Sequence, residues 1–359
     1  MKNIFLQAST ILISLTLLIS CSNNAADEIP DASADLNAQV LANTSVGVIT
    51  ETYKSLYTNS QTLVTAVANL TIGDEAKLTA VKNAWMATRS PWEKSEGFLY
   101  GPVDTEGIDP AIDSWPVNVN DINNILNSSV AITESLLENN NEARGFHTIE
   151  FFVWGLNGNK PASQLTAREI EYLVAASRNL KAKTEQLYNG WSSSQGNFAN
   201  NFITAGKAGN LLYTSQKTAL LEFTDGIITI ATEVATGKLE EPLNGNNGGA
   251  KPEAEESRFS NNSKLDFADN IRSIQNIYLG DYNNVDGKGL SDIVKAKNAT
   301  LDTSIKSKIT AAINAIESIP GTFTAAIFSN RVEVQNAQTQ VAALQLLLES
   351  QLKPMISNL

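Results

Sequence analysis

The only histidine of the chain lies in a short group of residues that could bind a metal ion. Residues 145–150 read GFHTIE and are followed by aromatic side chains. On a helix, His147 and Glu150 are three positions apart, so an imidazole nitrogen and a carboxylate can point to the same ion. Such a pair is costly to bury beside aromatic rings unless it is paired, metal-bound or used in chemistry. The alternative is a core histidine that is hydrogen-bonded to a nearby carboxylate.

A second group combines tryptophans with charged residues at helical spacing: Trp85, Arg89, Trp92 and Glu96. These positions follow one another at steps of four, three and four, and they share one face if the helix continues through Pro91. Glu96 is therefore a candidate metal ligand. The alternative is an ion pair between Arg89 and Glu96 at the edge of a helical bundle.

A third group lies in residues 255–267, in a predicted loop and at the start of the next helix. It contains Ser257, Ser260 and Asp266 together with two adjacent glutamates. Asp266 could add a carboxylate to a metal site. The alternative is a solvated acidic run followed by an ordinary helix cap.

The composition excludes several other kinds of site. The 359 residues contain 26 Lys and Arg, 38 Asp and Glu, one Cys and one His, with a net charge of -12. One cysteine cannot form an intramolecular disulfide or a thiolate zinc site, and one histidine excludes motifs that need two. An acidic surface also disfavours nucleic acid as a partner, because phosphate contacts need basic residues.

The N-terminus predicts export and attachment to a membrane by lipid. Residues 1–20 carry a basic start and an apolar run that is short for a membrane span, which is typical of a signal peptide. They end in Leu-Ile-Ser before Cys21, which resembles a bacterial lipobox. We expect Cys21 to be lipidated, residues 21–35 to form a flexible tether, and the protein to be held at the outer membrane or periplasmic face. The alternative is a signal-anchor helix with a buried thiol.

Beyond the tether, the hydrophobic pattern predicts an all-α fold. Apolar residues recur at steps of three, four and seven, and alternation with period two is not sustained. Residues 211–234, 265–279, 290–319 and 332–352 are each long enough to cross a small bundle. We expect two helical bundles, residues 36–195 and 196–359, which divide in a segment rich in Ser, Gly and Asn. Long connections around residues 101–121 and 237–262 are candidate functional loops.

Taken together, these groups resemble the imelysin family, which includes the insulin-cleaving membrane protease and iron-regulated protein A. The hallmark Gly-x-His-x-x-Glu motif of that family is matched by Gly145, His147 and Glu150. Other blocks that are similar to family signatures are Trp85, Arg89 and Glu96; Ser257, Phe259, Ser260 and Asp266; Trp115-Pro116; and Gly237-Lys238-Leu239 with Pro242.

The resemblance implies two helical bundles with the His-Glu motif near their interface, in a protein outside the cytoplasm that serves iron or haem acquisition. It also implies metal binding by the motif, while peptidase activity is the traditional label of the family. The expected metal ligands are His147, Glu150, Glu96 and Asp266. The residues expected to line the site are Trp85, Arg89, Trp92, Gly145, Ser257 and Ser260.

Residue chemistry indicates a site rich in carboxylates. With a single imidazole, most ligands would be oxygen, which suits iron, manganese or calcium at least as well as zinc. We therefore expect a tethered metal-binding protein that captures an ion or haem and hands it on, with a partner protein of an iron-uptake system as a candidate recipient. The resemblance supplies iron as the expected metal.

Three alternatives remain open. The first is a metallopeptidase of the imelysin type, in which a carboxylate would have to activate water. The second is a serine hydrolase with His147 as base and Ser257 or Ser260 as nucleophile, although the Gly-x-Ser-x-Gly elbow is absent. The third is a module that binds a partner protein or haem. Covalent c-type haem needs Cys-x-x-Cys-His, which the chain lacks, so only axial ligation by His147 would remain.

Overall fold

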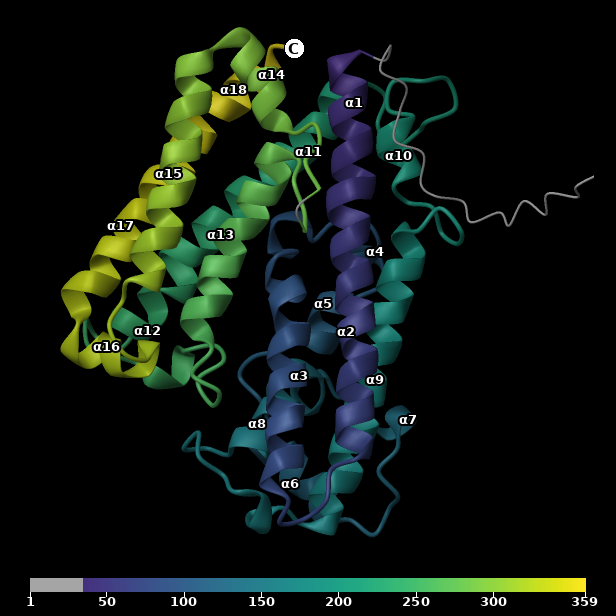
Figure 1. The fold of residues 1–359 in the computed structure, drawn as a ribbon, viewed down its shortest axis with the longest axis vertical. Coiled ribbons are helices and arrows are strands. Elements are labelled where there is room, and N and C mark those ends of the chain that lie inside the picture. Colours follow the sequence, from purple (N-terminus) through teal and green to yellow (C-terminus); the bar gives the residue numbers. More distant parts are fainter. Residues whose placement is uncertain (1–34, 284) are drawn as a thin grey trace, which may run out of the picture.

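The computed structural model describes residues 35–283 and 285–359, which form helices joined by loops (Figure 1). The predicted all-α fold is confirmed, because the described ranges contain helical domains and no strand. The predicted signal peptide, Cys21 and all of the predicted tether except Asp35 lie outside the described residues. Asp35 caps the first helix, since its carboxylate accepts a hydrogen bond from the backbone N–H of Asn37 at 3.0 Å.

Three long helices pack together in the N-terminal part: α2, α3 and α9. The α-helices of this part are α1 (Leu36–Asn43), α2 (Glu51–Ala68), α3 (Glu75–Glu93), α4 (Pro102–Thr105), α5 (Ile108–Ile112), α6 (Val119–Asn127), α7 (Glu134–Leu137), α8 (Gly145–Trp154) and α9 (Ala167–Trp191). A π-helical segment, η1 (Thr44–Thr50), joins α1 to α2, and the short 3-10 turns are η2 (Glu96–Phe98), η3 (Asn141–Ala143) and η4 (Ala162–Gln164). The apolar stripe of α2 is buried against α3 and α9.

The C-terminal part is built mainly on α11, α13, α15 and α17, with α13 packed on α15 and α15 on α17. Its α-helices are α10 (Asn200–Ile203), α11 (Gln216–Glu233), α12 (Glu240–Asn244), α13 (Ser263–Leu279), α14 (Leu290–Lys297), α15 (Ala299–Glu317), α16 (Phe323–Ser329), α17 (Arg331–Leu347) and α18 (Lys353–Ser357). Two π-helical segments, η5 (Val234–Lys238) and η7 (Leu348–Leu352), and the 3-10 turn η6 (Pro252–Ala254) complete it.

The two groups of helices share a contact surface along α11 and α13 (Figure 1). Helix α13 packs on α3 as well as on α15, and α11 packs on η2. The backbones meet closely there, because a Cβ placed on Gly226 of α11 would lie 2.2 Å from the carbonyl oxygen of Gly97 in η2. The buried apolar residues of both groups form one cluster. The division of the chain after residue 195 therefore stays a prediction.

At two places, helices begin or end differently from what the sequence pattern alone suggests. Pro91 lies inside α3 and does not end it. Proline cannot donate to the carbonyl oxygen four residues earlier, and the side chain of Asn59 donates to that oxygen, on Ala87, at 2.7 Å. The predicted run 290–319 is two helices, α14 and α15. Asn298 separates them, and its side chain caps α15 by accepting from the N–H of Leu301 at 3.0 Å.

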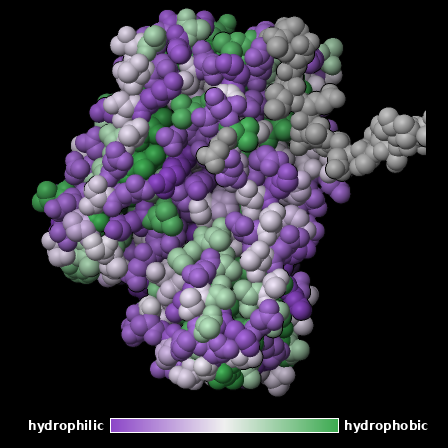
Figure 2. Space-filling model, in the orientation of Figure 1, coloured by the Kyte–Doolittle hydropathy of each residue, from purple (hydrophilic) through white to green (hydrophobic). Residues whose placement is uncertain are grey.

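The surface carries hydrophilic residues over most of the face seen in Figure 2, with hydrophobic residues in separate patches. Among the described helices, none has both the length and the apolar character that crossing a membrane requires.

Candidate metal centre

The backbone at the start of α8 places His147 beside the end of α5. Gly145 begins α8 with a φ of 79°, and a Cβ at this position would lie 2.3 Å from the carbonyl oxygen of Ile112. A residue with a side chain would therefore be strained and would push the two helices apart. Because Asp113 directly follows Ile112, this close approach brings its carboxylate next to the His147 ring.

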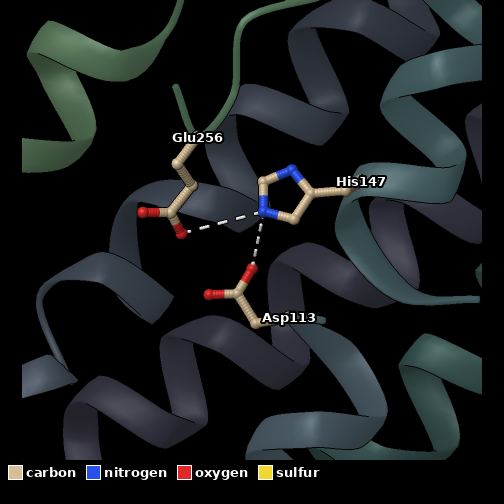
Figure 3. A group of neighbouring side chains, drawn as sticks. All are labelled: Asp113, His147 and Glu256. Atoms are coloured by element: carbon tan, nitrogen blue, oxygen red, sulfur yellow. Dashed lines mark ion pairs between the residues drawn. The ribbon is translucent and has the colours of Figure 1, made fainter. Parts of the chain in front are cut away.

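Two carboxylates point to the same ring nitrogen of His147 (Figure 3). Nε2 of His147 lies 3.1 Å from Oδ1 of Asp113 and 3.7 Å from Oε1 of Glu256. One ligand atom from each of these three residues lies within 4.8 Å of the other two. Among the described residues, Nε2 makes no well-aligned hydrogen bond, although it is buried. We call Asp113, His147 and Glu256 the His147 triad.

The other ring nitrogen is held by the second residue of the sequence motif. Nδ1 of His147 lies 2.9 Å from Oε2 of Glu150. The second oxygen of Glu150 accepts hydrogen bonds from the backbone N–H and the hydroxyl of Ser260, both at 2.7 Å. Glu150 therefore lies on the opposite side of the ring from the triad carboxylates, where it fixes the orientation of the imidazole.

A buried cation, Arg89, and a partly buried one, Lys238, face the carboxylates of the triad. The Arg89 guanidinium donates to Asp113, and its Nη2 lies 2.7 Å from Oε1 of Glu256. Nζ of Lys238, in η5, lies 2.9 Å from Oε2 of the same glutamate. Burial of several charges is tolerated here because each one contacts a charge of opposite sign.

These contacts shift the protonation equilibria in opposite directions. Burial and Arg89 alone would lower the pKa of His147, but its contacts with Asp113, Glu150 and Glu256 hold that pKa well above the ordinary value. Burial would raise the pKa of Glu256, yet Lys238, His147 and Arg89 hold it well below the ordinary range. The pKa of Asp113 is also lowered, because Arg89 and His147 outweigh the effect of burial. These shifts favour a charged imidazole facing ionised Asp113 and Glu256.

A cavity of about 740 Å³ adjoins the triad and is lined by Asp113 and Glu256. Its other lining residues are Glu96, Leu99, Asp109, Trp115, Pro116, Glu233, Thr236, Gly237, Lys238, Glu241, Lys251, Glu253 and Ala254. The Trp115 ring lies edge-on to His147, with ring centroids 4.8 Å apart. Burial raises the pKa of Glu96 to about 8, and the neighbouring acids add to this shift while Lys238 opposes it. The volume is sufficient for a hydrated ion or a small molecule.

The residues expected at the site lie around this centre in different roles. Of the four expected ligands, His147 belongs to the triad and Glu150 contacts its Nδ1. Glu96 instead forms a group with Glu93 and Asp113. Oδ2 of Asp266 lies 3.6 Å from Nε of Arg89, and its other oxygen accepts from Asn262 at 2.6 Å. The metal-binding roles of all four stay predictions.

The expected lining residues support the centre mainly through hydrogen bonds. Trp92 donates to Oδ2 of Asp113 at 2.6 Å, and Trp85 donates to the carbonyl oxygen of Phe146 at 3.0 Å. Ser257 is buried with a φ of 53°. Neither Ser257 nor Ser260 donates to His147 in the described structure, because both ring nitrogens face carboxylates.

Sequence reasoning missed three polar residues of the centre: Asp113, Lys238 and Glu256. Asp113 is two residues before Trp115-Pro116, and Lys238 lies inside Gly237-Lys238-Leu239. Both residues are therefore in or next to segments that are similar to family signatures. Glu256 is one of the two adjacent glutamates for which a solvated acidic run was the alternative interpretation. These signals were present, but nothing in the spacing connected three segments so far apart in the chain with residue 147.

The fold and the centre together define an all-helical protein in which remote segments surround one buried histidine with carboxylates. The imelysin family model (Peptidase_M75) matches residues 49–355, and the chain therefore belongs to the imelysin family.

Individual relatives agree with this assignment. The chain is 27% identical over 286 residues to iron-regulated protein A of Synechococcus elongatus, covering 78% of this chain and 76% of that protein. A solved structure from Parabacteroides distasonis, provisionally named an iron-regulated protein A precursor, is 29% identical with a TM-score of 0.76, covering 92% of this chain and 98% of that one. An imelysin-like protein from Psychrobacter arcticum shares the fold at 17% identity, with a TM-score of 0.72 and coverage of 91% and 97%.

Proposed function

We propose that this protein binds an iron ion at the His147 triad and serves iron acquisition in the cell envelope. The observation that carries the proposal is the convergence of two carboxylates on the buried Nε2 of His147, beside a cavity. Glu150 acts as a positioning residue for the ring. The predicted lipid on Cys21 would hold the protein at the membrane, where it captures the ion and passes it on.

The donor set of the triad fits a first-row transition metal. One imidazole nitrogen and two carboxylates are ligands that iron, manganese and zinc accept, and hard oxygen donors favour iron or manganese. Iron is preferred among these because two relatives carry the name iron-regulated protein A. The buried Nε2, which lacks a well-aligned hydrogen bond in the described structure, is the atom that a metal would engage. A bound ion would also neutralise the facing carboxylates.

The same geometry makes haem ligation and serine catalysis weaker candidates. The His147 side chain is fully buried, and both of its nitrogens face carboxylates, so an axial bond to haem would require the ring to leave its pocket. A serine hydrolase needs its histidine in contact with the nucleophile. Those contacts are occupied by Glu150, Asp113 and Glu256.

A metallopeptidase remains the alternative function, and the cavity beside the triad favours it specifically. Water activation needs an open coordination position and a base. Glu96 lines the cavity and has a pKa raised by burial to about 8, which is a suitable value for such a base near neutral pH. Incubation of the metal-loaded chain with an unfolded protein tests this alternative, which predicts cleavage that chelation and Glu96→Gln both abolish.

Titration calorimetry of the purified chain with Fe²⁺ under anaerobic conditions tests the binding proposal. We expect one ion to bind at the triad with micromolar or tighter affinity. His147→Ala, Asp113→Asn and Glu256→Gln should each weaken this binding by at least about tenfold, because the first removes a ligand and the other two replace an anionic ligand by a neutral amide. Glu333→Gln, which changes an exposed glutamate on α17, is the matched control. Absence of binding at micromolar concentrations, or normal binding by the triad variants, would overturn the proposal.

A further inference from the structure

A second group of carboxylates lies directly beside the His147 triad. It consists of Glu93 at the end of α3, Glu96 at the start of η2, and Asp113 after α5. One oxygen from each lies within 4.8 Å of the other two. Asp113 belongs to both groups, so the two groups share one carboxylate.

Glu96 distinguishes this group from an ordinary ion-pair network. Its side chain is 8% exposed and lines the cavity. Within residues 35–283 and 285–359, it makes no hydrogen bond and no ion pair of 4.0 Å or less, whereas Glu93 and Asp113 are both held by neighbours. A buried carboxylate without a partner is costly, and it persists only where something compensates for the cost.

The neighbouring cations make their close ion pairs with other carboxylates, and Lys238 acts on Glu96 only at longer range. Nη2 of Arg89 lies 2.6 Å from Oε1 of Glu93, and Nζ of Lys238 lies 3.9 Å from the other oxygen of that residue. Both cations also contact Glu256, so they are shared among several acids. Arg89 and Lys238 are the two fixed positive charges here, in addition to the His147 ring. The two groups and the acids that contact His147 or Arg89 provide six carboxyl groups: Glu93, Glu96, Asp113, Glu150, Glu256 and Asp266.

We propose that Glu93, Glu96 and Asp113 hold a second cation, adjacent to the ion at the His147 triad and sharing Asp113 with it. The inference rests on the proposed function, because the first ion orients Asp113. An all-oxygen donor set selects a hard divalent cation, and Mn²⁺ is a suitable probe for such a site. Two ions that share a carboxylate would convert the cavity wall into a dinuclear centre.

Mn²⁺ binding to the full chain tests the inference by stoichiometry and by electron paramagnetic resonance. We expect about two Mn²⁺ per chain, with a spin-coupled signal because the ions share Asp113. Glu96→Gln should leave one ion per chain and an uncoupled spectrum. His147→Ala should remove the ion at the triad. Glu333→Gln should leave both ions and the coupling, and circular dichroism of each variant confirms its folding.

The outcomes separate this inference from the proposed function. One ion per wild-type chain, lost in His147→Ala, would overturn the second site and leave the triad intact. Two ions that persist in Glu96→Gln, or two ions without spin coupling, would also overturn it. A second ion that is lost in Glu333→Gln would be an adventitious surface ion and would count against the inference. Absence of any bound Mn²⁺ and Fe²⁺ would overturn both proposals.

Discussion

His147 is fixed from both sides by carboxylates, and the two sides act differently. Glu150 contacts Nδ1 and is itself held by two hydrogen bonds from Ser260. The carboxylate can accept a hydrogen bond from Nδ1–H, which keeps the proton on Nδ1 and leaves the lone pair of Nε2 free to bind an ion at the triad. The arrangement thus determines which ring nitrogen faces Asp113 and Glu256.

The role of Glu150 predicts a change of tautomer when its charge is removed. In Glu150→Gln, the amide oxygen can still accept from Ser260, so the amide N–H₂ is directed at Nδ1 and favours the proton on Nε2. Iron affinity should then fall by about 10- to 100-fold, while stoichiometry and melting temperature stay close to those of the wild type. The chain has one histidine, so ¹⁵N-histidine NMR reports this tautomer alone.

Ser260→Ala is the graded control for this experiment. It removes the hydroxyl donor to Glu150 and keeps the backbone N–H, so we expect a smaller loss of affinity than in Glu150→Gln. Unchanged affinity and an unchanged NMR spectrum in Glu150→Gln would show that Glu150 does not position the ring.

Asp302, on α15, connects three helices of the C-terminal part through hydrogen bonds of its side chain. Its Oδ1 accepts from the hydroxyls of Tyr278 on α13 and Ser291 on α14, at 3.0 and 2.7 Å. Its Oδ2 pairs with Lys306 on α15 at 2.9 Å. Burial would raise the pKa of Asp302, but Lys306, Ser291 and Tyr278 together hold it below the ordinary value.

A pKa lowered by folding gives a defined dependence of stability on pH. The ionised form of Asp302 stabilises the fold above the ordinary aspartate pKa of about 3.9, and this contribution is lost as pH falls through the lower, folded-state value. Asp302→Asn should therefore lower the free energy of unfolding by about 1–3 kcal/mol at pH 7. The difference from the wild type should narrow as the pH falls below about 4.

Urea unfolding at several pH values measures this difference. Asp104→Asn, on the exposed side of α4, is the control and should change stability by less than about 0.5 kcal/mol. A difference between Asp302→Asn and the wild type that is constant from pH 7 to below pH 4 would contradict the assignment.

The whole molecule combines a strongly acidic chain with a cavity lined by carboxylates. The net charge is -12, and the cavity walls carry seven acids, Glu96, Asp109, Asp113, Glu233, Glu241, Glu253 and Glu256, against Lys238 and Lys251. Such a cavity raises the local concentration of cations and disfavours anionic ligands. This charge distribution favours a free metal cation over an anionic metal chelate as the ligand that enters the cavity.

The predicted lipid anchor also concerns the whole molecule, because it would decide where the protein meets its ligand. Expression in a Gram-negative host followed by membrane fractionation should place the wild type in the membrane fraction. Cys21→Ser removes the thiol that would carry the lipid, so this variant should shift to the soluble periplasmic fraction or remain uncleaved. A Ser22→Ala variant is the control and should stay with the membranes. Membrane attachment of a cleaved Cys21→Ser protein would contradict the lipid anchor.

The sequence by itself determined the all-α class and the motif at the centre. Periodic apolar residues are a local property, and they predicted α11 and α13 close to their observed positions. The His147–Glu150 contact was likewise predictable, because residues three apart on a helix are neighbours. Helix ends were less predictable, since a single cap such as Asn298 or a compensating donor such as Asn59 decides them.

Only the tertiary structure decided which carboxylates face His147. Asp113 reaches it because Gly145 lets α8 pack on the end of α5, and Glu256 reaches it from a loop more than a hundred residues later. The same packing places Glu96 at the cavity wall, where no described side chain hydrogen-bonds to it or forms an ion pair with it within 4.0 Å. Spacing along the chain carries no information on such long-range contacts, because they depend on how whole helices pack. The sequence therefore identified the histidine, and the fold selected its partners.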